Sequence, residues 1–260
     1  MSLLFTTSWD DGNALDVRIA ELLESYNLRG TFYVLPQEGN GTLRKETIRA
    51  MSEKHEIGAH TLHHRNLPGI DKQEMMKELT GSKQWIEHVT GKPCTMFCYP
   101  RGFVNDEVKD AVKDAGFAGA RTTEPLQFAM NDPCLLPTTL QVYPFPWRPR
   151  WKQWWHPLDP LGPLRAKWER LRALGTPLRA CMGWLPLAQW LLTHAIETKQ
   201  PCFHLWGHTK EIDRYNMWRD LESFLKFVSD QDIEAVTNGE LITALLSPTS
   251  PPTSAGCVPL

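Results

Sequence analysis

From its third residue the chain alternates between short apolar runs and longer segments in which apolar residues recur every three or four positions. The longer segments have the period of helices, as in Leu15, Ile19 and Leu23. The short runs predict eight buried strands, at 3–8, 31–35, 56–59, 95–98, 118–121, 136–142, 202–206 and 233–236. Repeated strand–helix units of this kind predict a parallel sheet with helices packed on it, an α/β fold.

The composition is that of a globular chain. Its 260 residues, 42% hydrophobic and 22% charged, can bury a large core. We predict one domain over 1–246, with an insertion at about 144–187, followed by a disordered tail at 247–260. The net charge of −2 gives no general attraction to nucleic acid or membranes. Because we find no signal-like segment and no disulfide spacing among the six cysteines, a cytoplasmic protein is expected.

Carboxylates and imidazoles follow two of the predicted strands. Asp10 and Asp11 come just after the first strand, and His60 and His64 follow the third. Alone, Asp-Asp-Gly is typical of a turn, and two histidines four residues apart are typical of a solvated helix end. However, the carboxyl ends of parallel strands gather at one face, where active sites lie. The pattern therefore indicates a divalent metal held by Asp11, His60 and His64, with Asp10 beside it as a general base of a hydrolase.

These residues belong to a series of motifs that resembles the polysaccharide deacetylase family, the NodB-homology carbohydrate esterases. The matching stretches, in the family's order, are Ser8-Trp9-Asp10-Asp11-Gly12, Gly30-Thr31-Phe32-Tyr33-Val34, His60-Thr61-Leu62-His63-His64, Phe97-Cys98-Tyr99-Pro100-Arg101-Gly102 and Gly207-His208-Thr209-Lys210-Glu211. Trp9 stands where the family usually has Phe. The resemblance implies a distorted (β/α)7 barrel in which residues of about 144–190 have no counterpart.

The resemblance also implies roles for individual groups. The backbone N–H of Tyr99 would stabilise the oxyanion, and His208 would protonate the leaving amine. His204 is the competing histidine, although it falls inside a strand rather than just past its end. Many relatives place an arginine before the proline of the third motif to hold the base. Here Arg101 and Arg121 are both candidates for that role, and the sequence does not choose between them.

The segment 143–187 is the second informative feature. It contains six tryptophans, eight prolines, eight basic residues and two acidic residues, which gives a local charge of +6. Three interpretations stay open: a subdomain that packs on the barrel, a lid whose tryptophans stack on sugar rings, and a surface that docks on anionic lipid. Trp147 of this segment, Trp206 and Arg121 are the candidate substrate-binding residues. The segment lacks a groove-reading module, so no nucleic-acid partner is expected.

The function expected from these features is removal of an N-acetyl group from an amino sugar, as in the synthesis of cell-envelope or secondary-metabolite sugars. The sugar would be lipid- or nucleotide-linked, and the enzyme cytoplasmic or peripheral at the inner face of the membrane. Zn²⁺ is the expected cofactor, and Co²⁺, Ni²⁺ and Fe²⁺ suit the same ligands. Two alternatives remain: hydrolysis of another C–N bond, as in allantoinase-like enzymes that open cyclic ureides, and a catalytically weak carbohydrate-binding protein.

Overall fold

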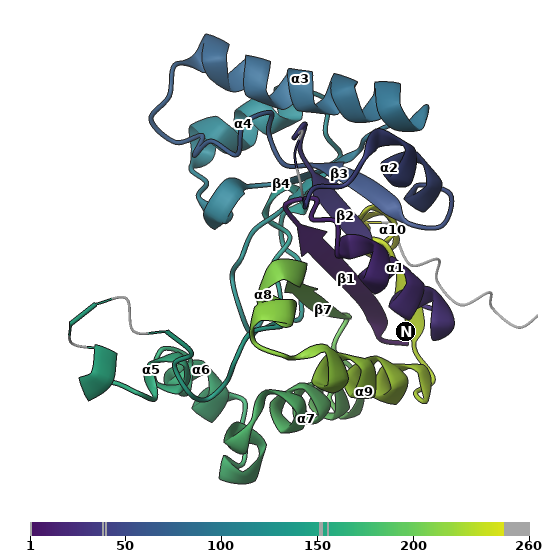
Figure 1. Ribbon diagram of the computed structural model, residues 1–260. Coiled ribbons are helices and arrows are strands. Elements are labelled where there is room, and N and C mark those ends of the chain that lie inside the picture. Colours follow the sequence, from purple (N-terminus) through teal and green to yellow (C-terminus); the bar gives the residue numbers. More distant parts are fainter. Residues whose placement is uncertain (1, 38, 40, 151–152, 155, 247–260) are drawn as a thin grey trace, which may run out of the picture.

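We describe a computed structural model of the chain that covers residues 2–37, 39, 41–150, 153–154 and 156–246 (Figure 1). The tail predicted at 247–260 lies outside the described residues, as do Trp151, Lys152 and Trp155 of the insertion. No helix within the described ranges combines the length and the apolarity that crossing a membrane requires.

Seven parallel strands form the barrel wall, in the order β5-β4-β3-β2-β1-β7-β6. The strands are β1 (Leu4–Asp10), β2 (Thr31–Val34), β3 (Glu56–Ala59), β4 (Met96–Cys98), β5 (Gly119–Arg121), β6 (Leu140–Gln141) and β7 (Cys202–Gly207). The ends of this sheet meet through Leu136, whose N–H donates to Ala120 and whose C=O accepts from Thr122, both at 2.8 Å. An eighth strand, β8 (Glu234–Val236), pairs with the first half of β1. The α/β barrel predicted from the sequence is confirmed.

The strand predicted at 136–142 is wrong as one continuous element. Leu136 pairs with β5, whereas only Leu140 and Gln141 form β6 against β7. Pro137 lies between the two pieces and has no N–H to donate to a ladder. Its carbonyl oxygen instead lies 2.9 Å from Nδ1 of His204. The chain thus crosses from one neighbouring strand to the other at this point and closes the ring.

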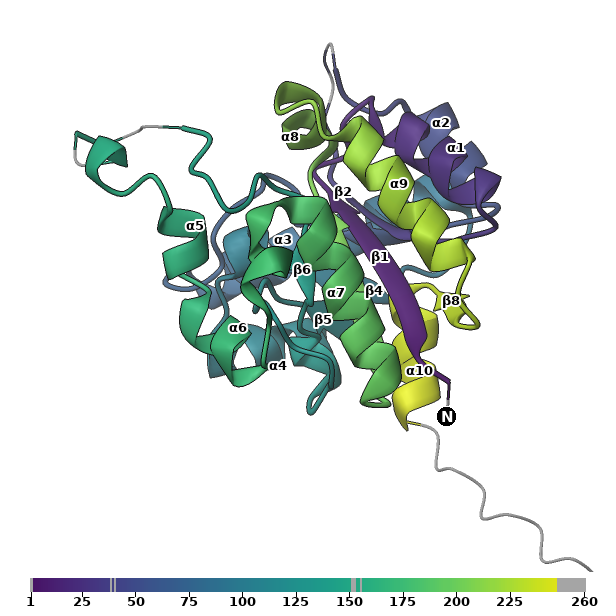
Figure 2. The same ribbon diagram turned by 90° about the horizontal axis from the view of Figure 1, so that it is seen from below.

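Ten α-helices occur among the described residues, and most cover the outside of the barrel (Figures 1 and 2). They are α1 (Asp16–Ser25), α2 (Lys45–Met51), α3 (Lys72–Thr90), α4 (Asp106–Asp114), α5 (Gly162–Arg165), α6 (Trp168–Ala173), α7 (Trp184–Glu197), α8 (Thr209–Arg214), α9 (Trp218–Ser229) and α10 (Asn238–Leu246). Asn105 caps α4 by accepting from the N–H of Val108 at 2.9 Å, as expected for an N-cap asparagine.

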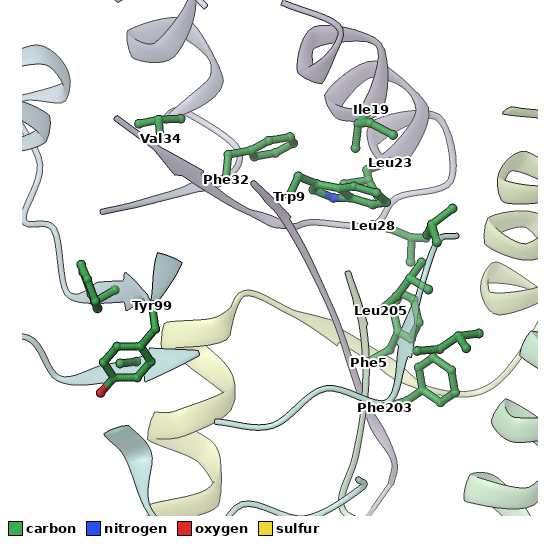
Figure 3. Close-up of a cluster of buried hydrophobic side chains, with 14 of the residues drawn as sticks. Phe5, Trp9, Ile19, Leu23, Leu28, Phe32, Val34, Tyr99, Phe203 and Leu205 are labelled. Atoms are coloured by element: carbon green, nitrogen blue, oxygen red, sulfur yellow. The ribbon is translucent and has the colours of Figure 1, made fainter. Parts of the chain in front are cut away.

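The strands divide their side chains between an outer core and the barrel interior. Phe5, Phe203 and Leu205 pack outward in the main apolar core (Figure 3). Several residues that alternate with them are polar and point inward: Ser8 Oγ lies 2.8 Å from Nε2 of His204. A hydrogen bond of this kind offsets the cost of burying both polar groups. The rigid wall that results holds the strand ends, and therefore the site, in place.

Candidate active site

The predicted site residues meet at the carboxyl end of the barrel. Asp10 ends β1, His60 directly follows β3, and His208 directly follows β7. Backbone conformations of positive φ then redirect the chain at Asp11 (79°) and at His64 (53°). The resulting cavity of about 430 Å³ is lined by Asp10, Asp11, His60, His64, Tyr99, Arg101, Thr123, Trp206, His208, Lys210 and Glu211. A larger hollow of about 680 Å³, between Glu24 and Ala235, contains none of these residues.

Asp11, His60 and His64 form a set of possible metal ligands. Oδ1 of Asp11 lies 3.8 Å from Nε2 of His60 and 3.5 Å from Nε2 of His64. One ligand atom from each side chain falls within 4.8 Å of the others. Nδ1 of His60 lies 2.8 Å from the carbonyl oxygen of Cys98, which is the outer bond that orients a metal-binding histidine. Burial lowers the pKa of His64 and that of His60, the latter to about 4, so both imidazoles are neutral at pH 7 and able to bind a cation.

A second grouping, Asp10, His60 and Cys98, fits a cation less well. Its ligand atoms also lie within 4.8 Å of one another. However, burial raises the pKa of the Cys98 thiol far above its usual value, and a metal requires the thiolate. All three side chains are buried, which leaves less room for substrate than at Asp11 and His64. The more open set is therefore the better candidate.

Asp10 forms a buried ion pair with Arg121. The Nη2 of Arg121 donates to Oδ1 of Asp10, and neither side chain is appreciably exposed. Burial alone would raise the pKa of Asp10, but Arg121, His60 and His208 together lower it to about 2. Asp10 is thus a carboxylate at every ordinary pH.

Of the two candidate arginines, Arg121 contacts Asp10, whereas Arg101 lies at the rim of the cavity. The substrate-binding role expected for Arg121 does not fit this placement, because its side chain is fully buried and does not line the cavity. The guanidinium stacks on Trp206, 4.7 Å from the ring centre. Trp206 itself lines the cavity, whereas Trp147 does not and is mostly exposed.

His208, not His204, faces the cavity. Its Nε2 lies 3.9 Å from Oδ2 of Asp10, and its Nδ1 lies 3.1 Å from Oε2 of Glu211. Burial would lower the pKa of His208, but the bond to Glu211 and the charges of Asp10 and Asp11 raise it overall. His204 is buried inside the barrel, where desolvation lowers its pKa to about 3.

The oxyanion role expected for Tyr99 is not supported. Its backbone N–H donates to the carbonyl oxygen of Arg121 at 3.3 Å, so this donor is already used in the contact between two strands. The Tyr99 hydroxyl is equally engaged, donating to the carbonyl oxygen of Cys134 at 2.9 Å. Neither group is free to meet a developing charge in this conformation.

Sequence reasoning did not assign roles to Lys210 and Glu211. The Nζ of Lys210 donates to Oδ2 of Asp11, and Glu211 holds His208. Both lie in the first turn of α8, directly after His208. Their presence in the last matching motif was the available signal, since its residues fall on one short turn beside the cavity.

Comparisons with known proteins indicate a family for part of the chain. Residues 4–120 match the family model described as polysaccharide deacetylase. A peptidoglycan-N-acetylglucosamine deacetylase of Bacillus cereus is 26% identical over 118 residues, which cover 44% of this chain and 54% of that protein. The match thus spans about half the length of such relatives.

Solved structures are similar over nearly the whole chain. A family 4 acetyl xylan esterase from Clostridium thermocellum, in complex with a cobalt ion, has a TM-score of 0.58 at 16% identity and covers 93% of this chain and 91% of that one. A Bacillus anthracis protein described as a pseudoenzyme of the same esterase family has a TM-score of 0.55 at 16% identity, over 93% of this chain and 66% of that one. At these identities the likeness establishes the fold.

Proposed function

Since residues 4–120 match the polysaccharide deacetylase family model, we propose that the chain is a member of that family and a metal-dependent hydrolase that removes acetyl from an N-acetylated amino sugar. The observation that carries this proposal is the pairing of Asp10 with His208 across 3.9 Å beside the donor atoms of Asp11, His60 and His64. A base, an acid and a cation-binding set then share one cavity, as hydrolysis of an unreactive amide requires.

Asp11, His60 and His64 would hold the divalent ion. One carboxylate and two neutral imidazoles suit Zn²⁺, which we propose as the natural ion, and also Co²⁺, Ni²⁺ and Fe²⁺. When bound, such an ion supplies Lewis-acid polarisation of the acetyl carbonyl. The cobalt ion in the acetyl xylan esterase structure supports a divalent ion in this type of fold.

Proton transfers fall to two side chains. Asp10, fixed by Arg121, accepts a proton from the water molecule that attacks the acetyl carbon. His208, kept protonated by Glu211 and the neighbouring carboxylates, gives a proton to the nitrogen as the C–N bond breaks. Acetate and a free amine leave. Because the N–H of Tyr99 bonds to Arg121, we assign it no part in these steps.

The substrate class is a further part of the proposal. We propose an amino sugar of a cell-envelope or secondary-metabolite pathway, carried on a lipid or nucleotide, whose ring lies near Trp206 in the cavity. A cytoplasmic location is part of this proposal. It is supported by five cysteines, Cys94, Cys98, Cys134, Cys181 and Cys202, which are buried and form no disulfide within the described residues.

Acetate release tests the proposal. Purified protein should release acetate from at least one member of a panel of N-acetylated sugars. Asp10→Asn and His208→Ala should each lower turnover by about two orders of magnitude or more, with metal content unchanged. His88→Ala, at an exposed position of α3, is the matched control. Full activity of Asp10→Asn would show that the assigned base is wrong.

The same assay separates the alternatives. Consumption of cyclic amides or ureides without acetate release would identify a hydrolase of another C–N bond. Sugar binding with bound metal and no turnover of any kind would identify a binding protein, comparable to the neighbour described as a pseudoenzyme. A binding protein would need neither Asp10 nor His208, whereas hydrolysis of a cyclic amide would use both, so the products decide between the two hydrolases.

A further inference from the structure

The segment 144–187 holds most of the large apolar side chains that the described part of the chain exposes. Nine such side chains are classed as exposed among the described residues, and seven of them lie here: Trp147, Trp154, Leu158, Leu161, Trp168, Leu178 and Met182. The exposed fraction is 61% at Trp147 and 85% at Trp154, so these side chains are not the edge of a core. A concentration of this kind marks an interaction surface.

The segment is folded against the barrel, so its outward side chains are held there by structure. Trp184 is buried and donates from Nε1 to the carbonyl oxygen of Gln141 at 2.7 Å. Leu171 and Ala180 are buried as well. Within the segment 144–187, which we call the arm, Oδ2 of Asp159 accepts a hydrogen bond from Nη2 of Arg165 at 2.8 Å. The exposed tryptophans and leucines are therefore presented by an anchored element.

This element extends away from the barrel. In Figures 1 and 2 the chain before α5 and the helices α5 and α6 stand off to one side, beyond the helices that cover the sheet. A shallow hollow of about 400 Å³ on it is lined by Leu161, Leu164 and Trp168, with charged groups at its margin. A projecting apolar arm can reach a surface without bringing the barrel into contact.

The charge of the segment indicates which surface. Residues 143–187 carry +6, which leaves −8 for the rest of a chain whose net charge is −2. Arg172 and Arg179 are exposed and form no ion pair with any described residue. Because this segment is positive and the rest of the chain is negative, an anionic surface should attract the protein and orient it with this segment toward the surface.

We propose that this arm docks on an anionic lipid surface. Its exposed tryptophans and leucines and Met182 enter the interface, and Arg172 and Arg179 contact phosphate groups. A second copy of the chain is a poorer occupant, because a symmetric contact would set two positive arms against each other. A neutral sugar is a poorer occupant as well, since it has no negative charge to pair with the arginines. The docking does not depend on which reaction the barrel performs.

Co-sedimentation of the full chain with vesicles tests the docking. It should bind phosphatidylcholine vesicles that contain phosphatidylglycerol, and bind pure phosphatidylcholine far less. Trp154→Ser/Leu158→Ser and Arg172→Ala/Arg179→Ala should each weaken binding about tenfold or more. Added salt should weaken vesicle binding of the parent chain, and should weaken binding of the arginine variant less.

Matched controls lie outside the arm. Leu246→Ser, at an exposed leucine of α10, and Lys72→Ala/Lys77→Ala, at exposed lysines of α3, should bind as the parent does. The arm variants should keep the parent's circular dichroism and its acetate release from soluble sugars, which separates this test from that of the reaction. Binding by neither vesicle, or equal loss in the controls, would overturn the docking. Arm variants that bind vesicles as the parent chain does would overturn it as well. In that case a raised KM for soluble sugar would indicate a sugar-binding segment, and loss of a dimer formed by the parent chain would indicate contact with a second copy.

Discussion

Asp10 and Arg121 are 111 residues apart in the chain, yet they form one buried ion pair. The sequence identified the base and left two arginines as its partner. Strand register determines that Arg121 is the partner of Asp10, because β5 places Arg121 opposite Cys98 of β4 and inside the barrel. Such register depends on contacts across the whole sheet, which a single sequence does not display. Metal-binding candidates were easier to find, since His60 and His64 lie close in sequence.

Asp16 offers a test of electrostatics at the scale of one side chain. It is fully buried at the start of α1, where Oδ1 accepts from Thr209 at 2.6 Å and Oδ2 has no partner among the described residues. Burial raises its pKa from 3.8 to about 8. Between these values the folded chain binds one proton more than the unfolded chain. The free energy of unfolding should therefore fall as pH rises from about 4 to 8, by up to about 1.4 kcal/mol per unit.

Asp16→Asn should remove this slope, because the amide keeps the acceptor for Thr209 and cannot ionise. Urea unfolding at pH 5 and pH 8 measures the effect. The variant should be more stable than the parent at pH 8, with a smaller difference at pH 5. Asp114→Asn, at an exposed position near the end of α4, should leave the slope unchanged. A parent whose stability rises between pH 5 and pH 8 relative to Asp16→Asn would contradict the assignment.

At the scale of elements, periodic segments were predicted well and short or uniformly apolar ones were not. The helical spacing of Leu15, Ile19 and Leu23 agrees with α1. By contrast, α7 was missed because its first half lies in the tryptophan- and proline-rich segment and its apolar residues occur on most sides. The seven-residue helix α2 has little apolar periodicity to detect. Helices α2 and α7 are stabilised by tertiary packing, which their local sequence patterns do not reveal.

The first turn of α8 gives a prediction for pH dependence. His208 must be protonated to act as the acid, so kcat/KM should fall as pH rises through its raised pKa. Glu211→Gln removes the negative partner of Nδ1, which should lower that pKa and move the alkaline limb to lower pH. Acetate release measured from pH 5 to pH 10 records the limb. An unmoved limb, or an equal shift in Glu222→Gln on α9, would exclude Glu211 as the positioning residue.

At the scale of the molecule, the stability of the barrel and the chemistry of the cavity depend on different residues. The parallel α/β sheet was predictable because strand–helix alternation extends along the chain, and the barrel was implied by the resemblance to a family. Closure through Leu136 follows from a proline crossing that the structure reveals. The domain boundaries at 1–246 and the insertion at 144–187 remain predictions. The proposed ligands lie in segments just past strand ends, while the apolar core lies behind the strands.

Removing the metal should therefore stop the reaction and leave the barrel folded. Dialysis against chelator should abolish acetate release, and Zn²⁺ or Co²⁺ should restore it. The far-UV circular dichroism spectrum should not change, although the thermal midpoint should drop by a few degrees as the bound ion's contribution is lost. Asp11→Ala should reproduce the chelated state and resist rescue. Undiminished turnover after verified metal loss would contradict a metal-dependent mechanism.

The position of Asn238 constrains the order in which the protein can be completed. At the start of α10, it reaches back into the barrel, where its side chain bonds to Thr6 at 2.9 Å and to Tyr33 at 2.8 Å. The inward polar groups of the first two strands are therefore not all paired until a residue 205 positions after Tyr33 has been made. Until then, we expect water or a chaperone to contact the side chains of Thr6 and Tyr33 in the nascent chain.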